Sequence, residues 1–400
     1  MSTPSPEEHV ASVAPARPAM PRAIWALGLV SLLMDVSSEL IHSLLPMFMV
    51  TVLGASALMI GVVDGIGEAT ALIVKVFSGA LSDRLGRRKS LAVFGYGLGA
   101  LSKPLFALAT SSGLVLFARV VDRIGKGIRG APRDALIADI APAGIRGAAF
   151  GLRQSLDTVG AFLGPALAIA LMLAWHDDFR AAFWVAIVPG LLSVGLLFFG
   201  VQEPPRAPGA RRVNPVSRAE LARLPGRYWW IVAIGGVFTL ARFSEAFLIL
   251  RAQQAGLAVA WTPMVLIAMN LVYSVAAYPF GRLADRVSHA RLLGAGLVVL
   301  MAADVVLAAG RGMPLILAGI ALWGLHLGMS QGLLATMVAD ASPPELRGTA
   351  FGLFNFVSGG AMLTASLLAG LLWDRAGAAA TFVTGAVFCL LTLVAMARRP

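Results

Sequence analysis

Apolar segments recur along almost the whole chain, separated by short stretches of Gly, Pro or charged residues. A helix that crosses the hydrocarbon core of a bilayer needs about 20 mostly apolar residues. The pattern therefore predicts an all-α membrane protein with twelve transmembrane helices. We expect these helices over residues 23–52, 56–82, 90–110, 113–136, 147–175, 179–200, 229–253, 260–283, 290–310, 313–340, 347–374 and 378–397.

One long polar interval, residues 201–228, interrupts this pattern and contains five prolines and six arginines. It divides the chain into a predicted N-terminal six-helix bundle, residues 23–200, and a C-terminal six-helix bundle, residues 229–397. Residues 1–22 are rich in Pro, Ala and Ser and lack the charge-then-apolar layout of a signal peptide. We expect them to form a disordered cytoplasmic tail, and the interval 201–228 to form a cytoplasmic linker.

The two halves repeat each other in sequence. The segment ADIAPAGIRGAAFGL at residues 138–152 returns as ADASPPELRGTAFGL at residues 339–353, and GALSDRLG at 79–86 returns as GRLADRVS at 281–288. Duplication of a six-helix unit is common among secondary transporters. The repeat therefore predicts two pseudo-symmetric bundles.

The composition agrees with a membrane protein, because 58% of the residues are hydrophobic, only 13% are charged, and the mean hydropathy is +0.81. Soluble domains carry about 25% charged residues. The sequence shows no nucleotide-binding loop, no cluster of metal ligands and no pairing of a nucleophile with a base, and its one cysteine, Cys389, excludes an intrachain disulfide. We therefore expect no enzyme activity, no cofactor and no bound metal.

The basic residues predict the orientation. The formal charge is +11, and the basic excess gathers in alternate short loops, which stay on the cytoplasmic side. We expect both termini in the cytoplasm, a monomer in the bacterial inner membrane, and no nucleic-acid partner. The basic residues in question are Arg84, Arg87, Arg88, Lys89, Arg146, Arg282, Arg286, Arg291, Arg398 and Arg399, together with the arginines of the linker.

The loop between the second and third predicted helices carries the segment Gly79-Ala80-Leu81-Ser82-Asp83-Arg84-Leu85-Gly86-Arg87-Arg88-Lys89. This segment resembles the signature of the major facilitator superfamily, Gly-x-Leu-Ala-Asp-Arg-x-Gly-Arg-Arg/Lys, with Ser82 in place of Ala. The resemblance implies a transporter in which this loop latches the halves together. We expect Arg129, Arg133 and Asp139 to join this gate. The alternative is that the basic residues only set topology.

The fifth predicted helix has the spacing Gly151-x8-Gly160-x3-Gly164-Pro165-x2-Ala168. It resembles the helix 5 signature of the drug:proton antiporter branch of that superfamily, which ends in Gly-Gly where this chain has Ala168 and Ile169. Small residues four apart let membrane helices approach closely. The resemblance implies export of a solute in exchange for protons.

Ionisable residues inside the predicted helices are the candidate machinery. A charge at the centre of a membrane helix costs about 2.5–3.5 kcal/mol on the insertion scale, so it persists when it is paired or faces a water-filled cavity. At 3.6 residues per turn the charges of the first, second and fourth helices each line one face. The proton-coupling candidates are Asp35, Glu39, Glu68, Asp64 and His42. The substrate-cavity candidates are Arg119, Asp122, Arg123, Lys126, Arg242, Glu245, Asn270, His326 and Gln331.

These observations predict a secondary active transporter that moves a small solute by alternating access, coupled to protons and exporting by antiport. One alternative is proton-coupled uptake of an anionic solute or a metal chelate, which the cationic fourth helix favours. Another is a membrane sensor or assembly factor that keeps the fold without transport. For each single charged residue, a structural ion pair between helices is the alternative interpretation.

Overall fold

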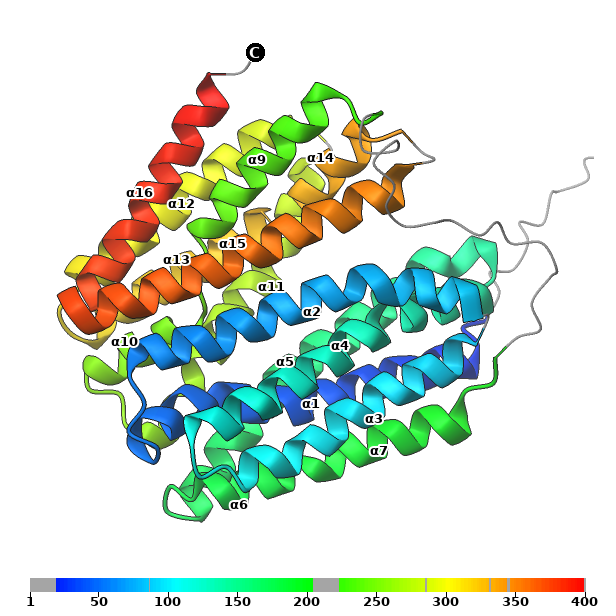
Figure 1. The fold of residues 1–400 in the computed structure, drawn as a ribbon, viewed down its shortest axis with the longest axis horizontal. Helices are drawn as coiled ribbons and strands as arrows, with labels where there is room; N and C mark the ends of the chain where they lie inside the picture. The colour runs from blue at the N-terminus through cyan, green and yellow to red at the C-terminus, as the bar shows by residue number, and fades with distance from the viewer. Residues whose placement is uncertain are drawn as a thin grey trace, which may run out of the picture.

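The computed structural model describes residues 19–85, 87–203, 223–284, 286–330, 332–343 and 346–398. This part of the chain is helical and contains no strand (Figure 1). The first half comprises α1 (Arg22–Thr51), α2 (Ala57–Leu85), α3 (Arg88–Ala107), α4 (Ser112–Ile140), α5 (Arg146–Ala174), α6 (Phe179–Val185) and α7 (Ile187–Gly200). The second half comprises α9 (Gly226–Leu240), α10 (Ala246–Gln254), α11 (Met264–Ala284), α12 (His289–Ala309), α13 (Met313–Ser330), α14 (Leu333–Ala341), α15 (Arg347–Ala376) and α16 (Ala378–Ala397).

Among the described residues, nine helical segments are long and apolar enough to cross a membrane. Three of the predicted passes do not meet this requirement of length and apolar composition, namely α3, α4 and the α9–α10 pair. In α4 the reason is its row of buried charges, and α9 and α10 are each too short because the backbone breaks between them. With these three included, the described helices make the twelve passes that the apolar pattern predicts.

Three passes that the sequence predicts as continuous helices are interrupted. The sixth divides into α6 and α7 at Ala186, whose carbonyl accepts a 2.6 Å hydrogen bond from the Ser37 hydroxyl. The seventh leaves helical geometry over residues 241–245, between α9 and α10. The tenth resumes as α14 after Gly332, which has a φ of +80°. Irregular backbone at membrane depth is tolerated where it lines a cavity or is buried in protein.

The two halves form separate bundles that meet along α2 and α15, which run side by side (Figure 1). The linker joins Gly200 of α7 to Gly226 of α9, and α1 begins and α16 ends at the same side of the bundles, which we call the linker end. The opposite side, where α1 ends at Thr51, is called the far end. The linker end is the side that the basic loops predict to be cytoplasmic.

Contacts between the halves close the far end. A Cβ on Gly370 of α15 would lie 2.6 Å from Leu58 Cα of α2, so the two backbones touch there. Asp374 accepts hydrogen bonds from the backbone N–H groups of Ala57 and Leu58, at 3.0 and 2.9 Å. The end of α1 also contacts α10, and α5 contacts the short turn Val259–Trp261.

Candidate functional site

Two adjoining cavities lie between the halves, and most of their lining side chains are polar or charged. The central cavity, of about 460 Å³, reaches the break between α9 and α10. The linker-side cavity, of about 580 Å³, extends along α4 and α5 to Arg133 and Gln154. Most of the candidate residues inside the predicted helices therefore line one continuous polar space.

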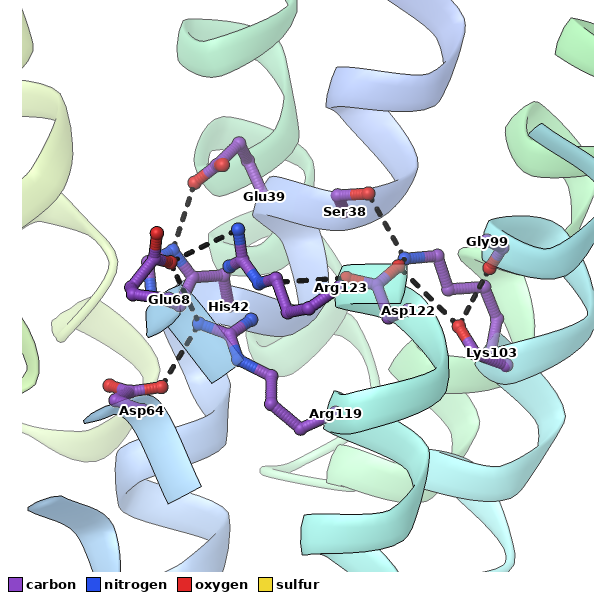
Figure 2. Close-up of polar contacts among 11 residues, drawn as sticks. Ser38, Glu39, His42, Asp64, Glu68, Gly99, Lys103, Arg119, Asp122 and Arg123 are labelled. Atoms are coloured by element: carbon purple, nitrogen blue, oxygen red, sulfur yellow. Dashed lines mark hydrogen bonds and ion pairs between the residues drawn. The ribbon is translucent and has the colours of Figure 1, made fainter. Parts of the chain in front are cut away.

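Two arginines of α4 face two acids of α2 (Figure 2). Nη2 of Arg119 donates to Oδ1 of Asp64 at 3.0 Å and lies 3.8 Å from Oε1 of Glu68, while Nη1 of Arg123 lies 3.1 Å from the same Glu68 oxygen. Asp64 and Glu68 lie four residues, or about one turn, apart on α2, and Arg119 and Arg123 lie four residues apart on α4. The two acids and the two arginines therefore face each other from neighbouring helices. The arginine side chains are 3% and 4% exposed and that of Glu68 is 36% exposed. Glu68 thus covers two buried cations at the cavity surface.

Asp122 points away from the cavities into a buried ion pair. Its Oδ1 lies 2.8 Å from Nζ of Lys103 on α3, and the two side chains are 5% and 1% exposed. Lys103 also donates to the hydroxyl of Ser38 on α1 at 3.0 Å (Figure 2). Asp122 Oδ2 lies 3.8 Å from Nε of Arg123. This network joins α1, α3 and α4 behind the arginine pair, so the structure places Asp122 in support of the cavity wall and not at its surface.

The acids of α1 differ in their partners. Nδ1 of His42 lies 3.3 Å from Oε2 of Glu39, and both residues line the central cavity. Asp35 lines the linker-side cavity. In the described part of the chain, no side chain or backbone group forms a hydrogen bond or an ion pair with the Asp35 carboxylate.

The glycines of α5 lie directly behind these acids. A Cβ on Gly160 would lie 2.9 Å from Cβ of Asp35, and a Cβ on Gly164 would lie 2.9 Å from Cβ of Glu39. Gly151 has no atom within 4 Å of its Cβ position, and Pro165 is buried within the helix. Two of the three motif glycines therefore set the distance between α5 and the carboxylates of α1.

The second half contributes Arg242, Glu245 and Asn270 to the cavity wall. The guanidinium carbon of Arg242 lies 5.6 Å from the ring centroid of Phe238. His326 lines neither cavity: it is fully buried, and its Nδ1 lies 2.9 Å from the carbonyl oxygen of Gly296. The structure thus places His326 between helices, away from the predicted substrate contact. Gln331 lies outside the described residues.

The predicted gate at the linker end is described in part. Arg88 at the start of α3 pairs with Asp139 of α4, and the backbone N–H of Arg88 donates to Glu203 at 2.7 Å. Arg87 immediately precedes α3, and a Cβ on Gly79 would lie 3.6 Å from Cβ of Ala131, an ordinary van der Waals distance. The side chains of Asp83 and Arg84, and the whole of Gly86, lie outside the described part of the chain.

The structure corrects one expected contact of that gate. Arg133 lies 3.0 Å from Asp134 and donates to the Ser31 hydroxyl at 3.0 Å, and Arg129 stacks on the ring of Tyr96 at 4.9 Å. Neither arginine pairs with Asp139 in the described structure, because both side chains turn toward α1 and α3 and Arg88 takes that carboxylate.

Several charged residues that sequence reasoning missed belong to these networks. Lys103 is the buried partner of Asp122, and Arg153 of α5 bridges Asp134 at 3.3 Å and Asp157 at 2.8 Å. Arg153 and Asp157 are spaced by four residues on one helix, a signal that could have identified them. Lys103 has no such signal, because its partner lies on another helix.

The chain has extensive similarity to known proteins. Residues 27–269 and 246–400 match the sequence profile of the Major Facilitator Superfamily. Over 376 residues, the chain is 33% identical to an MFS-type transporter of Methanocaldococcus jannaschii, and the alignment covers 92% of each protein.

Solved structures show the same fold. The nucleoside transporter NupG has a TM-score of 0.74 at 13% identity and covers 95% of this chain and 100% of its own. A bacterial homologue of the human lysosomal transporter Spinster, in an inward-facing and occupied conformation, has a TM-score of 0.75 at 16% identity and covers 95% of this chain and 97% of its own. The chain therefore belongs to the major facilitator superfamily, and it is an integral membrane transporter and not an enzyme.

Proposed function

We propose that the protein is a proton-coupled secondary transporter that moves a small solute by alternating access, with Asp35 as its principal proton carrier. One observation carries this assignment. Asp35 faces the linker-side cavity without a hydrogen-bond or ion-pair partner among the described residues, whereas Asp64 and Glu68 are paired with buried arginines.

A carboxylate in a membrane cavity serves as a proton carrier when its surroundings change between the two open states. Asp64 and Glu68 each form an ion pair with a buried arginine, at 3.0 and 3.1 Å. Asp35 has no such partner, and Gly160 holds α5 directly against its Cβ. A shift of α1 relative to α5 and to the cavity water would therefore act on Asp35 more than on the other acids.

Export in exchange for protons is the proposed direction. It is supported by the resemblance of the α5 glycine pattern to the antiporter branch and by the contact of Gly160 and Gly164 with the residues Asp35 and Glu39. Proton-coupled uptake of an anionic solute is the second candidate, favoured by Lys126, an exposed cation that lines both cavities.

The closed far end and the cavity reaching toward the linker end support an inward-facing state of the cycle. The similarity to a Spinster homologue in an inward-facing conformation agrees with this proposal. It rests further on the predicted orientation, in which the linker end is cytoplasmic.

The test uses liposomes that contain the purified protein and a trapped pH-sensitive dye, with inward gradients of a panel of solutes imposed in turn. We expect at least one solute gradient to move protons. Asp35→Asn should abolish this proton movement while solute counterflow, which needs no net proton transfer, continues. Proton movement opposite to the solute identifies antiport, and movement in the same direction identifies uptake by symport.

The matched control is Asp177→Asn, an exposed loop residue at which the same chemical change should leave both signals unaltered. Asn also tolerates the positive φ of 66° at this position. Solute-coupled proton flux in Asp35→Asn at the level of the unmodified protein would overturn the assignment.

A further inference from the structure

Six residues line both cavities and so mark the level at which the two spaces join. We call this level the waist. It consists of Glu39, Glu68, Lys126, Ala161, Asn270 and Tyr273. The first four come from α1, α2, α4 and α5 of the first half, and the last two come from α11 of the second half. A solute bound at the waist touches both halves.

The polar groups of the waist fall into two classes. Glu39 is within 3.3 Å of His42, and Glu68 is within 3.1 Å of Arg123, so both carboxylates have partners inside the protein. The ammonium of Lys126, the side-chain amide of Asn270 and the hydroxyl of Tyr273 form no hydrogen bond or ion pair with any residue that the structure describes. The waist groups without a partner in the described protein are therefore a cation and two neutral groups that can donate hydrogen bonds.

Among the cations of α4, Lys126 is the one whose side chain is exposed. Arg119 and Arg123, two turns and one turn before it on α4, are buried beneath Glu68, while the side chain of Lys126 is exposed to the cavities. Its carboxylate neighbours at the waist already contact other residues, Glu39 with His42 and Glu68 with Arg123. Asp35, the remaining unpaired acid of the first half, lines only the linker-side cavity and is not part of the waist. Glu245 lines only the central cavity, where it lies beside Arg242.

We infer that the waist binds an oxyanion group of the solute, a carboxylate or a phosphoryl group. Lys126 supplies the charge, and the amide of Asn270 and the hydroxyl of Tyr273 supply hydrogen bonds from the opposite half. An ammonium offers three donors, an amide two and a phenol one, and an ionised oxygen accepts such bonds more strongly than a neutral one does. This inference rests on the proposed transport function and names its substrate class.

Binding across the halves also gives the solute a means of biasing alternating access. A ligand shifts a conformational equilibrium only through a difference in its affinity for the two states. An anion held by Lys126 on α4 and by Asn270 on α11 keeps both sets of contacts only while these helices stay at their present separation.

The test measures anion binding without any proton gradient. Four probes share one ring and differ in charge: benzoate, phenylphosphonate, neutral benzamide and cationic benzylammonium. Each is titrated against the full-length protein in detergent at constant ionic strength set with chloride, and the thermal midpoint Tm reports binding. We expect benzoate or phenylphosphonate to raise the Tm, and benzamide and benzylammonium to raise it less.

Substitutions then locate the site. Lys126→Gln should weaken binding of the anionic probe by about tenfold or more, because it removes a hydrogen bond between two charged groups. Lys126→Arg should retain most of the affinity, and Asn270→Asp should weaken it by placing a negative charge opposite Lys126. Lys75→Gln is the matched control, since Lys75 is an exposed lysine of the linker-side cavity that lies outside the waist.

The anion site would be overturned if all four probes raised the Tm equally or if no probe raised it. It would also be overturned if Lys126→Gln and Asn270→Asp each left the affinity for the anionic probe unchanged. A loss of affinity in Lys75→Gln equal to that in Lys126→Gln would overturn the placement at the waist. Because binding is read without a proton gradient, its failure leaves proton coupling through Asp35 intact, and an uncoupled Asp35→Asn transporter leaves the anion site intact.

Discussion

The hydroxyl of Ser244 donates a 2.6 Å hydrogen bond to Oδ2 of Asp64, across the boundary between the two halves of the transporter. Arg119 donates to the other oxygen of the same carboxylate. Ser244 lies in the break between α9 and α10, where its hydroxyl also accepts from the N–H of Ala246. The interruption of the seventh pass thus presents a side chain that joins the break between α9 and α10 to α2 near the far end.

Ser244→Ala should favour the state in which the far end is open. The substitution removes a hydrogen bond to a carboxylate, a loss of about 1.5–3 kcal/mol, from the closed far end. We expect the ratio of far-open to far-closed molecules to rise by about tenfold or more. Spin labels at Thr51 and Gln253, exposed far-end positions in opposite halves, would report a longer distance in a larger fraction of molecules. The labelled protein carries Cys389→Ala to remove its only native cysteine.

Ser38→Ala is the control for this measurement. Ser38 bonds to Lys103 within the first half, so its loss should leave the distribution of distances unchanged. An unaltered distribution in Ser244→Ala would show that this bond does not hold the far end closed.

Asp374→Ala should also favour the state in which the far end is open. Asp374 of α15 accepts from two N–H groups at the start of α2 in the opposite half, and a carboxylate at a helix N-terminus is also favoured by the helix dipole. Loss of a capping side chain costs about 0.5–2 kcal/mol. We expect the far-open fraction, measured with the same labels, to rise by a factor of roughly two to thirty.

The matched control is Asp178→Ala. Asp178 caps α6 by accepting from the N–H of Ala181 at 3.0 Å, within one half. This variant should lower the Tm slightly and leave the distances unchanged. If the two variants change the distances equally, the effect of Asp374 is a general loss of helix stability and not a gate.

The twelve passes could be predicted from the sequence because mostly apolar segments, separated by Gly, Pro or charged residues, recur along the chain. The last, residues 378–397, agrees with α16 to the residue. The break over residues 241–245 could not, because the apolar pattern continues on both sides of Arg242. That break is stabilised by tertiary contacts, namely the bonds of Ser244 to Asp64 and Ala246. A local pattern carries no information about partners on another helix.

In the candidate site, too, the features set by helical spacing could be predicted and those set by contacts between helices could not. Helical spacing placed Asp64 with Glu68 on one face of a predicted helix and Arg119 with Arg123 on one face of another, and the structure brings these faces together. Lys103 was missed because a single lysine near the end of an apolar segment usually extends its charge to the membrane surface. Only the packing of α3 on α4 shows that it points inward to Asp122.

Lys103→Met should lower stability more than most single substitutions in this protein. It would leave Asp122 as a buried charge without its principal partner, which costs about 3–5 kcal/mol. The double variant with Asp122→Asn should recover part of this loss, because the unpaired charge is gone. Thermal unfolding in detergent would compare the two variants. A double variant no more stable than Lys103→Met alone would show that the loss comes from packing and not from charge.

Gly164→Ala should displace α5 from α1 and impair transport. The added methyl would lie 2.9 Å from both Glu39 Cβ and the Val36 carbonyl oxygen, closer than carbon atoms pack, and neither of these atoms can rotate away. Overpacking of this kind costs about 1–3 kcal/mol, so the Tm and solute counterflow should both fall. Gly151→Ala makes the same change in the same motif where no atom lies within 4 Å, and it should lower neither the Tm nor counterflow, since Ala favours a helix more than Gly does. Equal losses in the two variants would mean that the loss does not come from the contact of α5 with α1, whereas loss in Gly164→Ala alone ties the motif to the position of Glu39.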